Sequence, residues 1–129
     1  MNKLIDFIKN VLANNAEIQS YTAGRIFEFS TAQGTHTYPM ILWSIISDKT
    51  LADYIDSIGE AWKAEVQIDV FTKSVEASAA LGNIVLNAFN SAELTEGILS
   101  SYTNEYIPSY TDEDETYRYI IRAYINHTL

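Results

Sequence analysis

The side chains with the most reactive chemistry are two histidines, and their neighbours in the sequence do not build a reaction centre. His36 and His127 are the only histidines, and neither has a carboxylate or second histidine at ligand spacing. They are interpreted as a loop residue and a tail residue. A serine nucleophile needs a base and an orienting acid, and no G-x-S-x-G turn is present to display one. We therefore assign no catalytic residue and expect that the protein is not an enzyme.

Two groups of carboxylates could do chemistry if folding supported them. Asp53 and Asp56 can share a helix face, and paired carboxylates act as acid and base when burial separates their pKa values. They lie in a polar connection, so a solvated surface is the simpler interpretation. The acidic run Asp112 to Glu115 lacks the D-x-D-x-D-G frame of a calcium loop and is interpreted as a hairpin tip.

Cofactor motifs are missing from the sequence. There is no cysteine, which excludes zinc and iron–sulfur sites built on thiolates. The five glycines are scattered and form neither G-x-G-x-x-G nor a phosphate-binding loop. We expect no metal and no cofactor.

Length and charge restrict the class of protein. The 129 residues fit one domain, residues 1–129, and an apolar fraction of 47% is ordinary for a globular chain. The net charge is −9, whereas nucleic-acid binders present a basic surface. The same charge discourages docking on an anionic membrane, and no run reaches the ~20 apolar residues of a membrane span.

Periodicity predicts two main helices. In the first, apolar residues recur at helical spacing and the pattern ends at Asn14-Asn15, which favour turns. The second begins after Ser74, a good N-terminal cap, and reaches Phe89 or Asn90. The stripe of the first helix consists of Leu4, Ile5, Phe7, Ile8, Val11 and Leu12.

Strand patterns account for most of the remaining chain. Strict alternation from Ala61 to Thr72 is typical of a sheet with one face on the core. Ser47 to Gly59 and Pro108 to Glu115 are interpreted as connections. The order of elements predicts an α+β fold, a mostly antiparallel sheet of about five strands with the two main helices packed on one face. The other expected strands are Arg25 to Phe29, Met40 to Ile46, Ile98 to Ile107 and Thr116 to Ile125.

Tyrosines are concentrated near the end of the chain. Tyrosine is enriched at protein interfaces because it buries a large area and keeps a polar tip. A sugar-stacking surface could also use such residues, and ordinary cross-strand pairing in a hairpin is the structural alternative. The six tyrosines after residue 100 are Tyr102, Tyr106, Tyr110, Tyr117, Tyr119 and Tyr124.

Several segments follow one another in a characteristic order. An N-terminal amphipathic helix precedes a "GRIF" strand, a Pro-led apolar strand ending in Ser, a "VQIDVF" strand, a helix opening with "KSVEA", and a closing "YRYII" strand. In this order, the segments resemble the tail-completion, or tail-terminator, proteins of long-tailed bacteriophages. The loop before Pro39 departs from the family, whose members often carry more prolines there. The matching segments are 24–27, 38–47, 64–71, 73–77 and 117–121.

The resemblance implies a structural role and no catalytic residues. Such proteins have an α+β fold and assemble as a ring, commonly of six subunits, on the finished tail tube. The implied partners are other copies of the chain, the tail tube protein and a head-completion or neck protein. The implied location is the tail–neck junction of the virion, after assembly in the host cytoplasm. DNA would pass through without specific binding, since a negative lumen repels phosphate.

Two hypotheses assign surfaces to this role. Asp48, Asp53 and Asp56 are expected to face the lumen or a ring neighbour. Tyr106 and Tyr110 are expected at a subunit contact. The alternatives are another neck or minor tail component of the same particle, a carbohydrate-binding module and, last, a small hydrolase.

Overall fold

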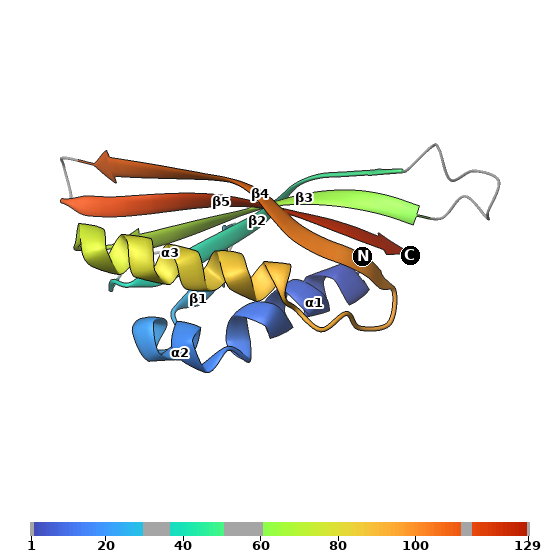
Figure 1. Ribbon diagram of the computed structural model, residues 1–129, viewed down its shortest axis with the longest axis horizontal. Coiled ribbons are helices and arrows are strands. Elements are labelled where there is room, and N and C mark those ends of the chain that lie inside the picture. The colour runs from blue at the N-terminus through green and yellow to red at the C-terminus, as the bar shows by residue number, and fades with distance from the viewer. Residues whose placement is uncertain (1, 30–36, 51–60, 112–114, 129) are drawn as a thin grey trace.

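The computed structural model describes residues 2–29, 37–50, 61–111 and 115–128, which form three helices and five strands. The strand order in the sheet is β1-β2-β3-β5-β4; β1 pairs with β2 in parallel, and the other neighbours are antiparallel. Figure 1 shows the helices on one side of the sheet. The elements are α1 (Asn2–Ala13), α2 (Ala16–Thr22), β1 (Ile26–Glu28), β2 (Met40–Thr50), β3 (Ala61–Thr72), α3 (Val75–Asn90), β4 (Ile98–Thr111) and β5 (Thr116–Thr128).

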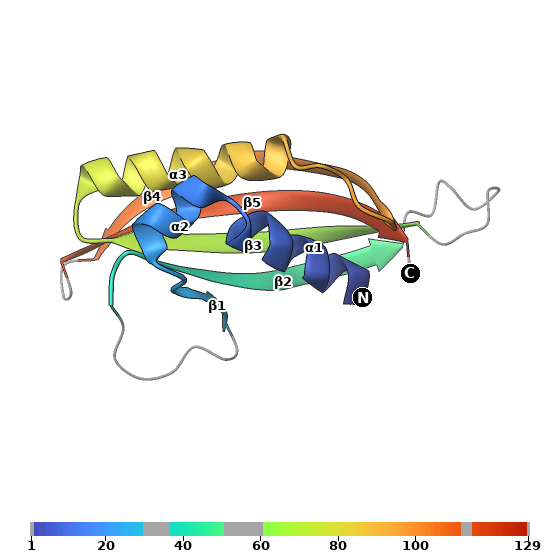
Figure 2. The same ribbon diagram turned by 90° about the horizontal axis from the view of Figure 1, so that it is seen from below.

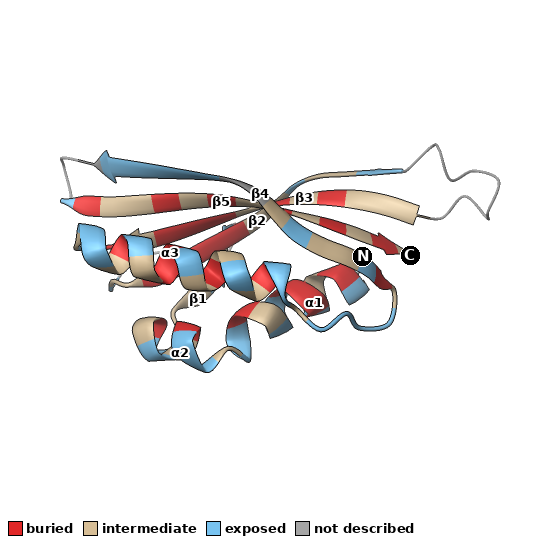
Figure 3. Cartoon of the chain, in the orientation of Figure 1, coloured by how far each residue is buried: buried red, intermediate tan, exposed pale blue. Residues whose placement is uncertain are grey.

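The core lies between the helices and the sheet. α3 packs on β3, β4 and β5, and Figure 2 shows α2 beside β1 and β2. Figure 3 shows the buried residues on the inward sides of α1 and α3 and along the central strands. Each large apolar side chain that is fully buried stabilises the fold by about 1.5–3 kcal/mol. The largest apolar ones are Phe7, Phe89, Leu4, Ile8, Leu12, Ile18, Ile41, Ile68, Leu81, Ile121 and Ile125.

The number of helices differs from the prediction, because a short helix follows the first one. α1 ends before Asn14, as expected, but Asn15 then caps α2 by accepting a hydrogen bond from the Ile18 N–H at 3.0 Å. α2 ends at Ala23, which adopts a left-handed conformation with φ of 51°. Its seven residues contain only two buried side chains, too few to give a helical period in the sequence.

The strand β2 is longer than predicted. A bulge between Ile45 and Ser47 breaks the apolar run and leaves Ile46 exposed, after which pairing with β3 continues to Thr50. Ser47 to Thr50 therefore belong to the sheet, and the prediction of a connection there was wrong. The rest of that predicted connection, residues 51–59, lies outside the described residues.

The two arms of the hairpin are also longer than predicted. β4 continues through Pro108, which was expected in the connection, because an edge strand tolerates a residue without an N–H. The pairing of β4 with β5 is irregular at two places. The first lies between Ile98 and Ser100, and the second is a bulge between Thr103 and Glu105. Because neighbouring residues alternate between faces, this bulge places Tyr102 and Tyr106 on opposite faces of the sheet.

Candidate functional site

His127 is buried and bonded on both sides of its ring. Its Nε2 lies 2.9 Å from Asp48 Oδ1, and its Nδ1 lies 3.1 Å from the carbonyl oxygen of Thr128. Both oxygens are acceptors, so a ring nitrogen that makes either hydrogen bond is its donor. The interpretation of His127 as a tail residue was wrong, because it lies within β5. The sequence places no carboxylate at ligand spacing, and it is the folded sheet that brings Asp48 beside the ring.

The contact between His127 and Asp48 spans three strands. β5 and β2 are separated by β3, whose Ala64 pairs with both Asp48 and Ile125. The small side chain of Ala64 leaves room for the histidine to reach across. The pair lacks a third ligand, since the described residues hold no group of three or more His, Cys, Asp and Glu side chains suited to a metal ion. The hydrogen bond between the pair therefore links the C-terminal end of β2 to β5.

Replacing Asp48 by alanine is expected to lower the free energy of unfolding by about 1–3 kcal/mol, because the buried His127 N–H loses its acceptor. Urea unfolding followed by circular dichroism measures this change. Thr50→Ala, at the exposed end of the same strand, serves as a matched control. An Asp48→Ala variant as stable as the control variant would show that the hydrogen bond contributes nothing to stability.

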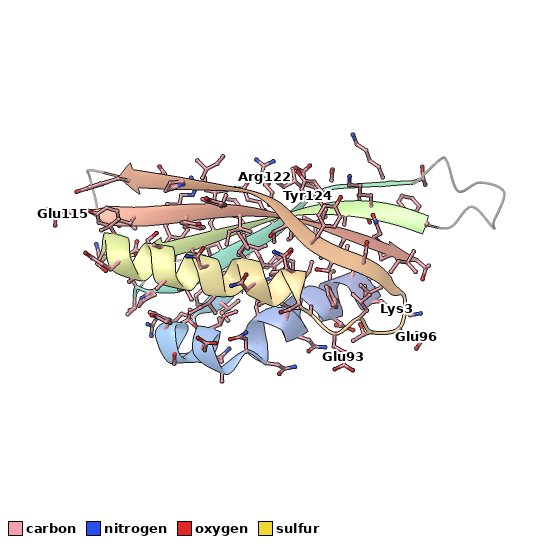
Figure 4. All side chains as sticks on the ribbon, in the orientation of Figure 1. Lys3, Glu93, Glu96, Glu115, Arg122 and Tyr124 are labelled. Carbon is pink, nitrogen blue, oxygen red and sulfur yellow. The ribbon has the colours of Figure 1, made fainter. Side chains whose placement is uncertain are left out.

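The face of the sheet that points away from the helices carries a network of charged and polar side chains. Arg122 Nη1 lies 3.0 Å from Glu65 Oε1, and the Tyr124 hydroxyl lies 3.3 Å from the same oxygen. Lys63 Nζ lies 5.0 Å from the centre of the Tyr124 ring. Figure 4 shows Arg122 and Tyr124 near the crossing of β4 and β5. Several groups of this face are paired with one another, whereas Arg118 Nε, Arg122 Nε and Asn126 Oδ1 are buried without a hydrogen-bond partner among the described groups.

The six tyrosines of the hairpin form three ring pairs across β4 and β5. Tyr106 and Tyr119 are almost parallel, with ring centroids 5.4 Å apart and an interplanar angle of 4°. This confirms the alternative of cross-strand pairing. However, the β4 ring of each pair remains open to solvent, at 38% for Tyr102, 57% for Tyr106 and 45% for Tyr110. The other pairs are Tyr102–Tyr124 and Tyr110–Tyr117.

Burial raises the pKa of the Tyr119 phenol above its ordinary value of 10.0, and the neighbouring Tyr106 phenol raises it further. As pH rises, Tyr119 loses its proton in the unfolded chain before it does so in the folded chain. Its contribution to the free energy of unfolding is therefore fully present below pH 10.0 and is lost as pH rises through the higher folded pKa. We expect Tyr119→Phe to lose less stability than the natural chain over that range. Unfolding titrations at a series of pH values measure this. Parallel curves above pH 10.0 would contradict the prediction.

Exposed apolar side chains collect at the two edges of the sheet. Within the described residues no strand pairs with the outer edge of β4 or of β1. Ten large apolar side chains of the described part are exposed, and most of them lie on or beside these two strands. Unpaired strand edges with apolar side chains are surfaces that readily bind another chain. Those at the edges are Leu99, Tyr102, Tyr106, Ile107 and Tyr110 on β4, with Phe27 and Phe29 at β1.

A groove accompanies the β1 edge. It has a volume of about 490 Å³ and lies between the helices and the first strand. Its wall combines apolar surface with one lysine and one glutamate, so it suits an aromatic or aliphatic side chain with a polar neighbour. The lining residues are Lys9, Ala13, Gln19, Gly24, Ile26, Phe27, Glu28 and Trp43.

Comparisons with known proteins identify a shared fold. The sequence matches no protein-family model and no curated protein. Among solved structures 24 chains match, one of them in a structure described as the virion of a native gene transfer agent particle. That match has a TM-score of 0.73 at 14% sequence identity and covers 95% of this chain and 92% of that chain. The same fold occurs in a virion.

The residues predicted for a functional surface are placed as follows. Tyr106 and Tyr110 lie exposed on β4, whereas Asp48 lies inside β2 and is bonded to His127. Asp53, Asp56 and His36 lie outside the described residues. No described helix has both the length and the apolar character needed to cross a membrane.

Sequence reasoning missed the apolar side chains that accompany the tyrosines at the edges. Ile107 and Leu99 lie on β4, and Phe27 and Phe29 lie at β1. Their alternation with polar residues is a weak signal for an exposed strand. However, the sequence of a strand does not reveal that it lies at the edge of a sheet.

Proposed function

We propose that this protein is a virion structural protein of the tail-terminator type. Assembled as a ring, commonly of six copies, it caps the tail tube of a long-tailed phage or a related particle. There it stops tube polymerisation and offers the joining surface for the head or neck. The observation that carries the proposal is the fold, which a virion chain shares over 95% of this chain. The resemblance in the order of the sequence motifs supports the same assignment.

The distribution of exposed apolar surface supports a ring. A head-to-tail ring requires two different patches on each subunit, one for each neighbour. The sheet offers such patches at its opposite edges, β4 and β1. The remaining partners are the tail tube protein and a neck protein, which would contact the two ends of the ring.

The net charge supports the passage of DNA through the ring. A chain with net charge −9 gives the assembled ring a strongly negative field, which repels phosphate over about 8–10 Å at cellular salt. DNA would therefore pass without binding. The lumen role of Asp53 and Asp56 remains part of this proposal. Asp48 is a weaker candidate, because its carboxylate is bonded to buried His127.

Replacing Tyr106 or Tyr110 by alanine is expected to weaken assembly more than monomer stability. Each is the exposed member of its ring pair, and an aromatic pair contributes only about 0.5–1.5 kcal/mol beyond its buried area. Urea unfolding measures stability, and the infectious yield of particles measures assembly. Tyr102→Ala, on the opposite face of the sheet, is the matched control. Equal losses of stability and yield would indicate a purely structural role.

Electron microscopy of particles made without this gene tests the proposal directly. A terminator predicts tails of uncontrolled length beside detached, filled heads. Tails of normal length would overturn the proposal. The second candidate, another neck or minor tail component, predicts normal tails and a different location of the labelled protein on the particle.

A further inference from the structure

The pairing registers place β1 at the same level along the sheet as the second half of β4. Starting from Phe27 and following paired residues across the sheet, one passes Leu42, Asp69 and Ile120 and arrives at Ile107. The two exposed edges of one copy are therefore aligned. By the same path Ile26 reaches Pro108, and Glu28 reaches Tyr106.

The aligned residues also share a face. Phe27 and Ile107 both lie on the face opposite the helices, and they are 37% and 48% exposed. Across the sheet β1 and β2 are parallel and the next three pairs are antiparallel, so β4 runs opposite to β1. A second copy that continues the sheet beside β4, with its helices on the same side, would therefore present β1 as an antiparallel partner to β4.

We propose that β4 of one copy lies antiparallel beside β1 of a second copy, with Ile107 of the first against Phe27 of the second. The inference rests on the proposed ring and names its subunit contact. The second copy is the occupant because both halves of the contact belong to one sheet, at one level and on one face. Such a contact is heterologous, so each copy uses β4 for one neighbour and β1 for the other.

On the face that carries the helices, the same placement brings Tyr106 beside Glu28 of the second copy and its groove. The groove of about 490 Å³ includes Glu28 and Ile26 in its wall. One side of the Tyr106 ring stacks on Tyr119, and its exposed side can cover the groove while its hydroxyl donates to a carboxylate. Apolar contacts on one face and a polar contact on the other would together fix the register.

The edges limit how far this contact can extend. β1 has only three residues, and Pro108 on β4 has no N–H to donate. Short edge strands, prolines and bulges are features that prevent indefinite sheet growth. The contact is therefore confined to about three residue pairs and depends on the side chains for its strength.

Cysteine cross-linking tests the contact cleanly, because the chain has no cysteine of its own. Residues directly opposite each other on paired strands have Cβ atoms about 4.5–5.5 Å apart, within reach of a short bis-maleimide. We expect a mixture of purified Phe27→Cys and Ile107→Cys chains, concentrated in solution, to give a cross-linked dimer. The double variant is expected to give a ladder of higher oligomers. Val75→Cys, 56% exposed at the start of α3, replaces Phe27→Cys in the control mixture and should give no product above background.

Three results would overturn the contact. Dimers from Ile107→Cys alone, as abundant as in the mixture, would indicate a symmetric β4–β4 contact. Product in the Val75→Cys control at the same level would indicate random collision. No product in the mixture at any concentration would show that the two edges do not meet. The gene-deletion phenotype is scored separately, so the terminator role can stand while this contact fails.

Discussion

Replacing Arg118 by alanine is expected to lower the free energy of unfolding by about 3 kcal/mol, because it leaves a buried carboxylate without its cation. Arg118 Nη2 lies 2.9 Å from Asp69 Oδ2, and Asp69 is only 4% exposed on β3. Gln67 still donates to Asp69 at 3.1 Å after the substitution. The Nε of Arg118 is buried and unpaired among the described groups, and losing it offsets part of the cost. Both effects reduce the expected loss to the lower end of the about 3–5 kcal/mol that breaking a buried ion pair costs.

The sheet offers a matched control for this substitution. Arg122 makes a similar contact with Glu65 on the same two strands, but the Glu65 side chain is more exposed than that of Asp69. Arg122→Ala should therefore cost about 1 kcal/mol or less. Combining Asp69→Asn with Arg118→Ala should recover part of the larger loss. Equal losses for the two arginine variants in urea unfolding would contradict the role of burial.

Replacing Gly82 by leucine is expected to lower the free energy of unfolding by about 2–3 kcal/mol through overpacking. A Cβ atom at this position of α3 would lie 2.4 Å from Cδ1 of the Tyr119 ring on β5. Carbon atoms in contact prefer about 3.5–4.0 Å, so the helix would have to move away from the sheet. Leucine has a higher helix propensity than glycine, and this difference raises the free energy of unfolding by only about 1 kcal/mol.

The neighbouring position provides the comparison for Gly82. Asn83 is exposed on the same helix, so Asn83→Leu changes propensity without meeting the sheet and should be nearly neutral. Pairing Gly82→Leu with Tyr119→Ala should cost less than the sum of the two single changes, since the second removes the clashing ring. A Gly82→Leu variant as stable as the natural chain would show that α3 can shift at no cost.

Local patterns predicted the elements that depend on local chemistry. Alternation placed β3 at Ala61–Thr72, and the structure gives the same bounds. Ser74 was predicted as a helix cap, and its hydroxyl accepts a hydrogen bond from the Ala77 N–H at 3.1 Å. In both cases the sequence signal lies within a few residues along the chain, although β3 itself pairs with the more distant β2 and β5.

The features that sequence reasoning missed depend on contacts between distant residues. Asp48 and His127 are 79 positions apart, and only the strand order brings them together. The continuation of β2 beyond Ile46 depends on a bulge that interrupts the apolar run. The exposure of Ile107 likewise depends on β4 being the last strand of the sheet, which its own residues do not determine.

The bulge between Thr103 and Glu105 determines to which face of the sheet each side chain in the second half of β4 points. Removing one residue there would exchange the two faces, so Tyr106 and Tyr110 would leave the helix side and Ile107 would enter it. Removing two residues would restore the original assignment. The length of this segment can therefore change between related chains only in even steps if the aromatic rings are to keep their side. A length difference of one residue would indicate an edge that meets a different surface.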